Sequence, residues 1–449
     1  MHLTPTARYR ATKPRTPPSG CAKTLVRSRK CTTCDRRREA EMATVQMAAR
    51  HRLAHPLAWW LALLIAMIAA GIVGGACTLL NGLQVTGLND RVPWGLWITH
   101  DLSAIALGAG AFTFSAAVYL FRIKRLEPLA RAAVLVGFLG YTSAMLALLL
   151  DIGRPDRFWH PLVYWNVHSV LWEITLCVIL YSTVLVLEML PMVFDSRFFD
   201  RRPRLRAFGH KLHRLTPILA VVGMGLSLLH QSSLGATYGV LSGRAIWFKP
   251  SLPIMFILSA VMGGVGLTLL ATILTGKLRR RQLVPRDVQL QVARFVGYAA
   301  LAYLYIKLWD WAATSYYSHA PGTADALTRL QATTPYTLTF WWWEIVLGLL
   351  IPAIVLLYRP LRHNDRAVLM ALGLLIFGVI VNRWNTTLSG LIAPPDWSPG
   401  VLGGVVVASY TPTWVEIAVS AGILGYALLV FTLAVKYLRI YGPSQPERA

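Results

Sequence analysis

Residues 57–80 read LAWWLALLIAMIAAGIVGGACTLL and contain no charged side chain. About 20 consecutive apolar residues are enough for an α-helix to cross the hydrocarbon layer of a bilayer. Nine further apolar segments of similar length follow, which predicts an all-α, polytopic membrane protein with about ten transmembrane helices. The ten segments cover residues 57–80, 94–121, 132–150, 168–190, 215–236, 252–275, 295–313, 338–358, 367–388 and 413–435.

The lysines and arginines predict how these helices are oriented. Thirty-six of the 44 lie before the first helix, after the last helix or in alternate connections. Because cytoplasmic loops carry such an excess, we expect both termini to lie in the cytoplasm. The net charge of +24 is then mainly a topology signal. Since the charges are divided among short loops and a tail, they do not indicate a nucleic-acid partner.

Almost all ionisable side chains inside the helices fall in the outer half of the membrane under this topology, and Glu188 is the main candidate in the inner half. A charge in a membrane helix costs on the order of 3 kcal/mol unless it is paired or hydrated. Such residues therefore indicate pairing or function, although some are rim residues that reach the headgroups. The outer set consists of His100, Asp101, Asp151, His168, Glu173, His230, Lys307, Asp310, Glu344, Arg383 and Glu416.

Tryptophan shows the same asymmetry. Fourteen of the 16 tryptophans lie on the outer side, and Trp59 and Trp60 are the exceptions. An ordinary aromatic belt occupies both interfaces. The excess indicates either rings that sandwich a planar ligand or an anchor surface for a partner docked on the outer face.

Three regions are expected along the chain. Residues 1–54 are basic and lack apolar periodicity, which predicts a disordered leader, and Met42 and Met47 offer alternative translation starts. Residues 55–440 form the transmembrane domain, and residues 441–449 form a cytoplasmic tail. The leader's three cysteines fall short of the four ligands of a structural metal site, so no metal is expected.

A weak internal repeat organises the helices. LWEITL (171–176) and WWEIVL (342–347) begin two helices that lie four apart in the series. The helices before these two end in Asp151 and Asp310. The helices after them carry His230 and Arg383, which can bear a positive charge, near the outer end. The pattern predicts that helices 2–5 and 6–9 are parallel four-helix bundles, with helices 1 and 10 added. Chance matching of a few polar positions is the alternative.

The polar set favours quinone chemistry over other reactions. The sequence contains no phosphate-binding loop, dinucleotide-binding turn or nucleophile elbow. Haem needs histidines that face each other, and three candidates allow at most one outer haem, so none is expected. A quinone needs hydrogen-bond donors for its carbonyls and two protons, which carboxylates and histidines supply. A haem-b anchor and a secondary transporter, whose site would lie near the bilayer centre, are the alternatives.

Six motifs stand out among the apolar segments: VPWGLWITHD (92–101), DIGR (151–154), WNVHSVLWEITLC (165–177), HQSSLG (230–235), FWWWEIVL (340–347) and TPTWVEI (411–417). They resemble the integral membrane subunits of the polysulfide reductase/NrfD family, and most of all the HybB-type subunit of periplasmic Ni/Fe hydrogenases. The resemblance covers residues 57–440. It implies a protein of the bacterial inner membrane with two haem-free four-helix bundles, which pass electrons between menaquinone or ubiquinone and a periplasmic iron-sulfur partner. That partner joins the bundles to a catalytic subunit, which is expected to be a hydrogenase.

The resemblance also implies where the quinone pocket lies, at the outer end of the first bundle. His230 or His168 would bind a carbonyl oxygen, and Asp101 or Asp151 would exchange protons. Where His168 stands, the hydrogenase type is expected to have asparagine. The complete set is Asp101, Asp151, Glu173 and His230 as catalytic residues, Trp97, Arg154, His168 and Gln231 as binding residues, and Lys307, Glu344 and Arg383 as candidates for proton transfer. Arg154 is expected to favour ionised carboxylates, and the last three to serve chiefly the fold.

Overall fold

A computed structural model describes residues 32–242, 244, 246–316, 327, 330, 335–392 and 408–441. The chain divides into two units, residues 1–59 and residues 60–449. All regular structure within the described residues is helical, which confirms the predicted all-α class. Nine described helices are long and apolar enough to cross a membrane, by length and composition.

The first helix begins earlier than the apolar pattern suggests. Helix α1 spans Thr32–Asn81, so residues 32–54 are helical where a disordered leader was expected. This stretch is rich in Ala, Arg, Glu and Met, which are strong helix formers, and it contains neither Gly nor Pro. Cys21, Cys31 and the rest of the expected leader before Thr32 lie outside the described residues.

The remaining long helices match the predicted segments in order. They are α2 (Leu96–Leu120), α3 (Glu127–Asp151), α5 (Val170–Phe194), α7 (Thr216–Gly239), α8 (Leu252–Leu278), α9 (Arg286–Tyr316), the π-helix η5 (Leu338–Leu350) continued by α11 (Ile351–Leu357), α13 (Asp365–Ile392) and α14 (Trp414–Tyr437). The expected seventh segment lies in α9, which is not among the nine apolar spans. Its charged residues, Lys307 and Asp310 among them, lower its hydropathy.

Short helices occupy the connections. They are η1 (Leu83–Val85), η2 (Lys124–Leu126), η3 (Pro155–Arg157), α4 (His160–Val163), η4 (Arg197–Phe199), α6 (Pro203–His213) and α12 (Arg359–Arg362). We call the end of the spans that carries η2, α6 and α12 the basic end, because the arginine-rich connections lie there. The opposite end is called the outer end.

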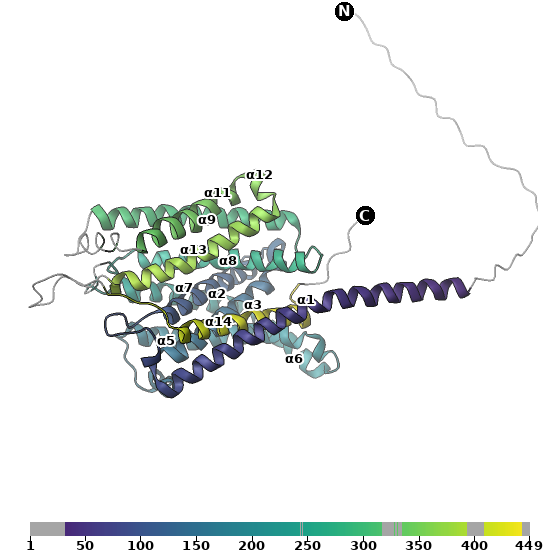
Figure 1. The fold of residues 1–449 in the computed structure, drawn as a ribbon, viewed down its shortest axis with the longest axis horizontal. Helices are drawn as coiled ribbons and strands as arrows, with labels where there is room; N and C mark the ends of the chain where they lie inside the picture. Colours follow the sequence, from purple (N-terminus) through teal and green to yellow (C-terminus); the bar gives the residue numbers. More distant parts are fainter. Residues whose placement is uncertain are drawn as a thin grey trace, which may run out of the picture. The chain divides into compact units, whose positions relative to one another are not determined.

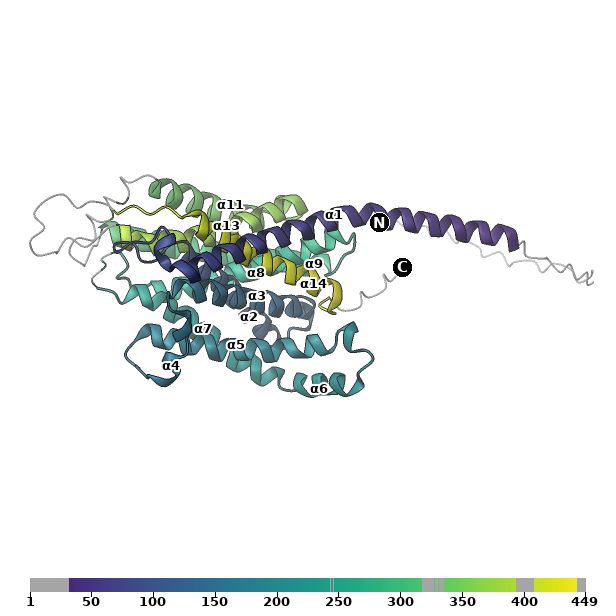
Figure 2. The ribbon, with the colours of Figure 1, turned by 60° about the horizontal axis from the view of Figure 1, so that its bottom comes forward.

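Two groups of helices pack against each other (Figure 1). Helix α2 contacts α3 and α7, and α5 contacts the same two helices, while α8, α9, η5 with α11, and α13 form a second set of contacts. Helix α8 joins the groups by packing on α2, α3 and α7, while α14 lies along α3. Figure 2 shows α5 and α7 side by side, with α6 at their basic end. Because α8 packs on α2, α3 and α7 as well as on α9 and α13, the contacts do not separate two four-helix bundles, and the predicted pair of bundles stays a prediction.

Helices α2 and α8 approach each other closely because glycine lies at their contact. A Cβ atom on Gly110 would lie 1.7 Å from the backbone oxygen of Ala260, and one on Gly264 would lie 2.2 Å from the backbone nitrogen of Ala111. Small residues at membrane helix interfaces allow such contacts. The two groups of helices are therefore held together at a backbone-to-backbone contact.

Substitution of Gly110 by leucine is expected to separate α2 from α8 and to lower the yield of folded protein severely. Overpacking usually costs about 1–3 kcal/mol, and no flexible side chain can move aside here. Gly225→Leu is the matched control, because a Cβ atom on Gly225 meets open space. Size-exclusion profiles and melting temperatures in detergent measure the effect. Equal stability of the two variants would contradict the close packing.

Candidate functional site

The first polar cluster consists of Asp101 on α2, Tyr141 and Asp151 on α3, and His230 and Gln231 on α7. His230 is fully buried, and Gln231 and Asp101 are nearly so. The His230 Nδ1 atom lies 3.1 Å from the Tyr141 hydroxyl. Asp101 lies in the second turn of α2 and Asp151 ends α3, so both carboxyl groups lie at the outer side of the pair formed by His230 and Tyr141. The cluster thus joins three helices of the first group.

Several buried atoms of the first polar cluster have no hydrogen-bond partner among the residues that the structure describes. They are the His230 Nε2 atom, both side-chain amide atoms of Gln231, and one carboxylate oxygen on each of Asp101 and Asp151. Leaving a buried polar atom unpaired costs about 1–3 kcal/mol, so native proteins rarely do so. A set of donors and acceptors of this kind fits a ligand that carries carbonyl oxygens and exchanges protons.

The cluster extends deeper than the outer rim. His230 lies nine residues before the end of α7 at Gly239, a distance of about 13 Å along the helix axis. Asp101 lies five residues after the start of α2 at Leu96, or about 8 Å. Asp151 is the last residue of α3 and is half-buried. The three residues therefore mark a polar path from the outer end towards the middle of the bundle.

Tyr141 is a member of the cluster that sequence reasoning did not select as a site residue. It is fully buried, and its ring packs against Tyr181 with a centroid distance of 4.4 Å. A tyrosine hydroxyl in an apolar helix, far from both interfaces, needs a hydrogen-bond partner. The sequence therefore indicates that Tyr141 needs a hydrogen-bond partner, but it does not identify His230 as that partner.

Two other predicted residues are placed by specific contacts. Glu173 on α5 is half-buried, and its Oε1 atom accepts a 2.7 Å hydrogen bond from the Ser233 hydroxyl on α7. Trp97 is buried, and its Nε1 atom donates to the backbone oxygen of Glu416 at 3.2 Å. Trp97 therefore attaches α2 to α14, a structural contact that the quinone hypothesis did not include.

Arg154 and His168 lie at the surface of the outer end. Arg154 donates to Asp156 at 3.0 and 3.1 Å, and both side chains are largely exposed. The guanidinium holds the pKa of Asp156 below its usual range. Arg154 therefore pairs with Asp156 and not with Asp101 or Asp151, the carboxylates on which it was expected to act. His168 is exposed in the connection before α5.

Glu416 is a buried structural carboxylate and not a rim residue in contact with headgroups. Its carboxylate accepts hydrogen bonds from the backbone N–H of Gly87 at 2.7 Å and of Thr413 at 2.9 Å, and from the Tyr410 hydroxyl. The Tyr410 oxygen in turn accepts from the backbone N–H of Leu96 at 2.8 Å. Glu416 thus caps α14 and fixes the outer connection that leads into α2.

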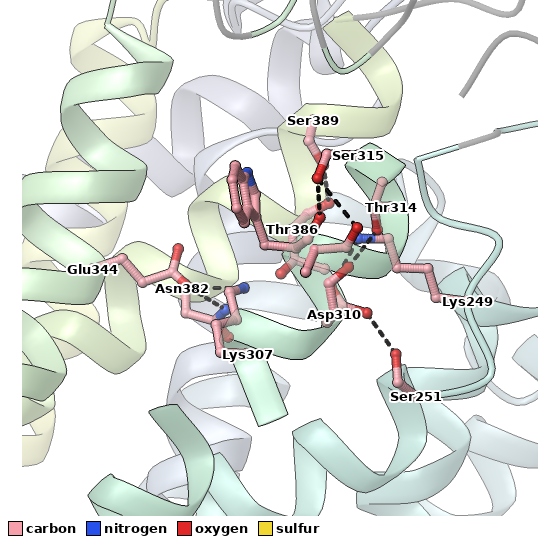
Figure 3. A network of polar contacts seen from close by, with 12 residues as sticks. Lys249, Ser251, Lys307, Asp310, Thr314, Ser315, Glu344, Asn382, Thr386 and Ser389 are labelled. Carbon is pink, nitrogen blue, oxygen red and sulfur yellow. Dashed lines mark hydrogen bonds and ion pairs between the residues drawn. The ribbon is translucent and has the colours of Figure 1, made fainter. Parts of the chain in front are cut away.

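The second polar cluster consists of Lys307 on α9, Glu344 on η5, and Asn382, Arg383 and Asn385 on α13. The Lys307 Nζ atom lies 2.7 Å from Glu344 Oε1. Asn382 donates to the same oxygen at 2.9 Å, and Asn385 donates to the other oxygen at 2.7 Å. Figure 3 shows Lys307, Glu344 and Asn382 converging from three helices. Both oxygens of this buried carboxylate are therefore paired within the protein.

Arg383 extends the second polar cluster to α8. It is fully buried and donates to Asn382 Oδ1 and to the Ser259 hydroxyl, each at 2.8 Å. Its guanidinium lies 3.8 Å from the centroid of the Phe256 ring, a cation–π contact. Most polar atoms of the second cluster are paired, unlike those of the first. The arrangement suits a network that holds helices together.

A neighbouring ion pair completes the polar contacts of the second group. Asp310 accepts hydrogen bonds from Lys249 at 2.9 Å and from Ser251 at 2.6 Å (Figure 3). Glu344 itself lies in η5, a π-helix of 13 residues. Long π-helical stretches are rare and often occur at functional positions.

Comparison with known proteins gives these clusters a family context. A family model described as "Polysulphide reductase, NrfD" matches residues 84–395, which include both polar clusters. The chain belongs to this family. Membership of the NrfD family confirms the resemblance predicted from the motifs.

Three relatives show how far the similarity extends. The chain is 35% identical over 406 residues to the menaquinone reductase integral membrane subunit of Nitratidesulfovibrio vulgaris, covering 86% of this chain and 92% of the relative. It is 26% identical over 373 residues to the probable Ni/Fe-hydrogenase 2 b-type cytochrome subunit of Escherichia coli, covering 80% and 86%. It is 25% identical over 401 residues to the Hdr-like menaquinol oxidoreductase integral membrane subunit of Archaeoglobus fulgidus, covering 87% and 95%. NrfD-type similarity thus extends over most of each chain.

Proposed function

We propose that this chain is the quinone-reactive membrane subunit of a respiratory oxidoreductase, and that the first polar cluster binds the quinone. Membership of the NrfD family and the names of the relatives support a membrane subunit of a quinone-interacting complex. The observation that carries the proposal is the set of buried, unpaired donors on His230 and Gln231 beside two carboxyl groups. Comparison of quinone-linked with dye-linked turnover in Asp101 and His230 variants tests it.

The geometry suggests how these residues act on a quinone. When the Tyr141 hydroxyl donates to His230 Nδ1, the proton of the neutral imidazole lies on Nε2, which can then donate to a carbonyl oxygen. The Gln231 amide supplies a second donor. Asp151, half-buried at the outer end, and buried Asp101 connect this position to outer water, so they would carry the two protons that a two-electron reduction requires.

The partner and the quinone are proposed from the relatives. The relative with 35% identity is named a menaquinone reductase subunit, which favours menaquinone. The expected hydrogenase partner rests on the relative with 26% identity. We propose that an iron-sulfur subunit docks at the outer end, where Trp159, Trp165 and Trp414 are exposed. The charge asymmetry supports an inner-membrane protein whose outer end faces the periplasm.

Tyr141→Phe is expected to lower quinone-linked turnover about tenfold without loss of folded protein. Removing the hydroxyl frees His230 Nδ1, so the imidazole tautomer is no longer fixed, and a lost hydrogen bond of this type costs about 1 kcal/mol or more. The effect should appear in kcat more than in KM. Tyr181→Phe is the control, because that ring packs beside Tyr141. Equal losses in both variants would contradict a role in orienting His230.

The purified subunit is expected to carry no haem, although one relative is named a b-type cytochrome subunit. Haem b needs axial ligands such as paired histidines. Buried His230 contacts Tyr141, whereas His168 is exposed. A pyridine haemochrome assay measures the content. Stoichiometric haem b would overturn this expectation and favour the cytochrome reading.

A further inference from the structure

A groove of about 540 Å³ lies at the basic end, on the exposed side of α9. Arg125 of η2 forms one wall, and α9 forms the other with Asp287, Arg294, Phe295 and Tyr298. The groove therefore lies between the connection that follows α2 and the helix α9, which belong to different helix groups.

The charges along this groove are unbalanced. Arg125 forms an ion pair with Asp287, and both side chains are exposed. Arg294 is exposed too, and within the described part of the chain it has no hydrogen-bond or ion-pair partner. Its Cα lies eight residues after Arg286, about 12 Å deeper along α9. Arg294 directly precedes residues 295–313, the predicted seventh apolar segment, so its guanidinium lies at the basic edge of the apolar layer, within reach of lipid headgroups.

The deeper wall of the groove is apolar. Phe295 and Tyr298 are exposed there, and Leu301 and Tyr305 continue the exposed face of α9 towards the outer end. Spacings of three and four residues place these side chains on one side of the helix. A cationic mouth followed by an apolar wall is complementary to a molecule with an anionic head and a hydrocarbon chain.

We propose that this groove binds an anionic phospholipid. The phosphate would accept hydrogen bonds from the Arg294 guanidinium and from the side of Arg125 that faces away from Asp287, and one acyl chain would lie along Phe295 and Tyr298. Arginine binds phosphate through two parallel N–H donors, and basic pockets at the edge of membrane helices select anionic headgroups. The bound lipid links η2 to α9, in addition to the ion pair between Arg125 and Asp287. This site is independent of the quinone site.

Native mass spectrometry of the full chain, delipidated and then titrated with phosphatidylglycerol or phosphatidylcholine, tests the proposal. One tightly bound phosphatidylglycerol is expected for the unmodified protein, and about tenfold weaker binding for Arg294→Gln, because a charge-assisted hydrogen bond is lost. Arg294→Lys, which keeps the charge but loses the paired donors, should be intermediate. Glycerol phosphate at the same concentration should not displace phosphatidylglycerol, since it lacks the acyl chains.

Arg366→Gln is the matched control. Arg366 is an exposed arginine at the same end of the molecule, in the first turn of α13 and outside the groove. Its removal should leave phosphatidylglycerol affinity within twofold. Equal affinity of Arg294→Gln and the unmodified protein, or equal losses in the Arg294 and Arg366 variants, would overturn the proposal. If Arg294→Gln fails to fold, a melting temperature of Arg294→Lys that still rises with phosphatidylglycerol as in the unmodified protein would overturn it too.

Discussion

Asp101→Asn and His230→Ala are each expected to lower donor-to-quinone turnover at least about 100-fold, while turnover with a soluble dye stays within about twofold. Removing a general acid–base group typically costs 10²- to 10⁴-fold. In the proposed complex, a dye would accept electrons from the partner's iron-sulfur chain and would need no proton from the membrane subunit. Both substitutions lie inside the bundle, so docking of the partner at the outer end should persist. Steady-state assays of the purified complex with a water-soluble menaquinone analogue measure both rates.

Glu188→Gln is the matched control for Asp101→Asn. Glu188 on α5 is also a buried carboxylate with an unpaired oxygen, but it lies towards the basic end. The Glu188→Gln substitution should leave both quinone turnover and dye turnover unchanged, because the proposed site takes its protons from the outer end. Normal quinone turnover in Asp101→Asn and His230→Ala together would place the quinone site elsewhere, with the second helix group as the first place to search.

The membrane helices could be predicted because apolar length is a local property of the sequence. Nine of the ten expected segments satisfy it in the structure. The exception is the seventh segment, in α9, which carries Lys307 and Asp310. Their partners lie on η5 and in the connection before α8. Helix α9 accommodates these charges because each is paired with an oppositely charged residue from another part of the fold. The start of α1 could not be predicted from hydropathy, since residues 32–54 form helix without an apolar face.

The positions of the polar residues could be predicted, but their pairing could not. The sequence shows Asp101, Glu344 and Glu416 alike as carboxylates in the outer half of the membrane helices. Only the fold shows how each is paired: Glu416 by backbone donors, Glu344 by a lysine and two asparagines, whereas one oxygen of Asp101 has no partner within the described residues. The difference depends on side chains brought from other helices. It is also the reason for assigning the chemistry to the first polar cluster.

Two predicted site residues use their polar groups in contacts with other parts of the chain. Motif matching selected Arg154, but Asp156 lies two residues away and pairs with it, which a local reading of the sequence could have noticed. Trp97 was selected as a flat ring for a ligand, whereas its indole N–H is used to hold α14. In both cases the residue type suits quinone binding, but its N–H group already donates a hydrogen bond to another residue of this chain.

Lys307→Met and Glu344→Gln are each expected to destabilise the protein strongly, by on the order of 3–5 kcal/mol, because each leaves the opposite charge buried without its partner. The double variant should recover most of the lost stability, since it removes both charges. Melting temperatures of the single and double variants measure this. Single variants as stable as the unmodified protein would contradict a structural role for the second polar cluster.

The same variants address energy conservation. If electrons and protons both reach the quinone from the outer end, no net charge crosses the membrane, and a proton path from the basic end would be needed for coupling. Moving one charge against 100 mV costs about 2.3 kcal/mol, and the paired atoms of Lys307 and Glu344 make poor carriers while they remain bonded to each other. We therefore expect the folded double variant, reconstituted with its partners in proteoliposomes, to keep its quinone turnover and any membrane potential. A potential that disappears in this variant while quinone turnover persists would show that the second polar cluster conducts protons.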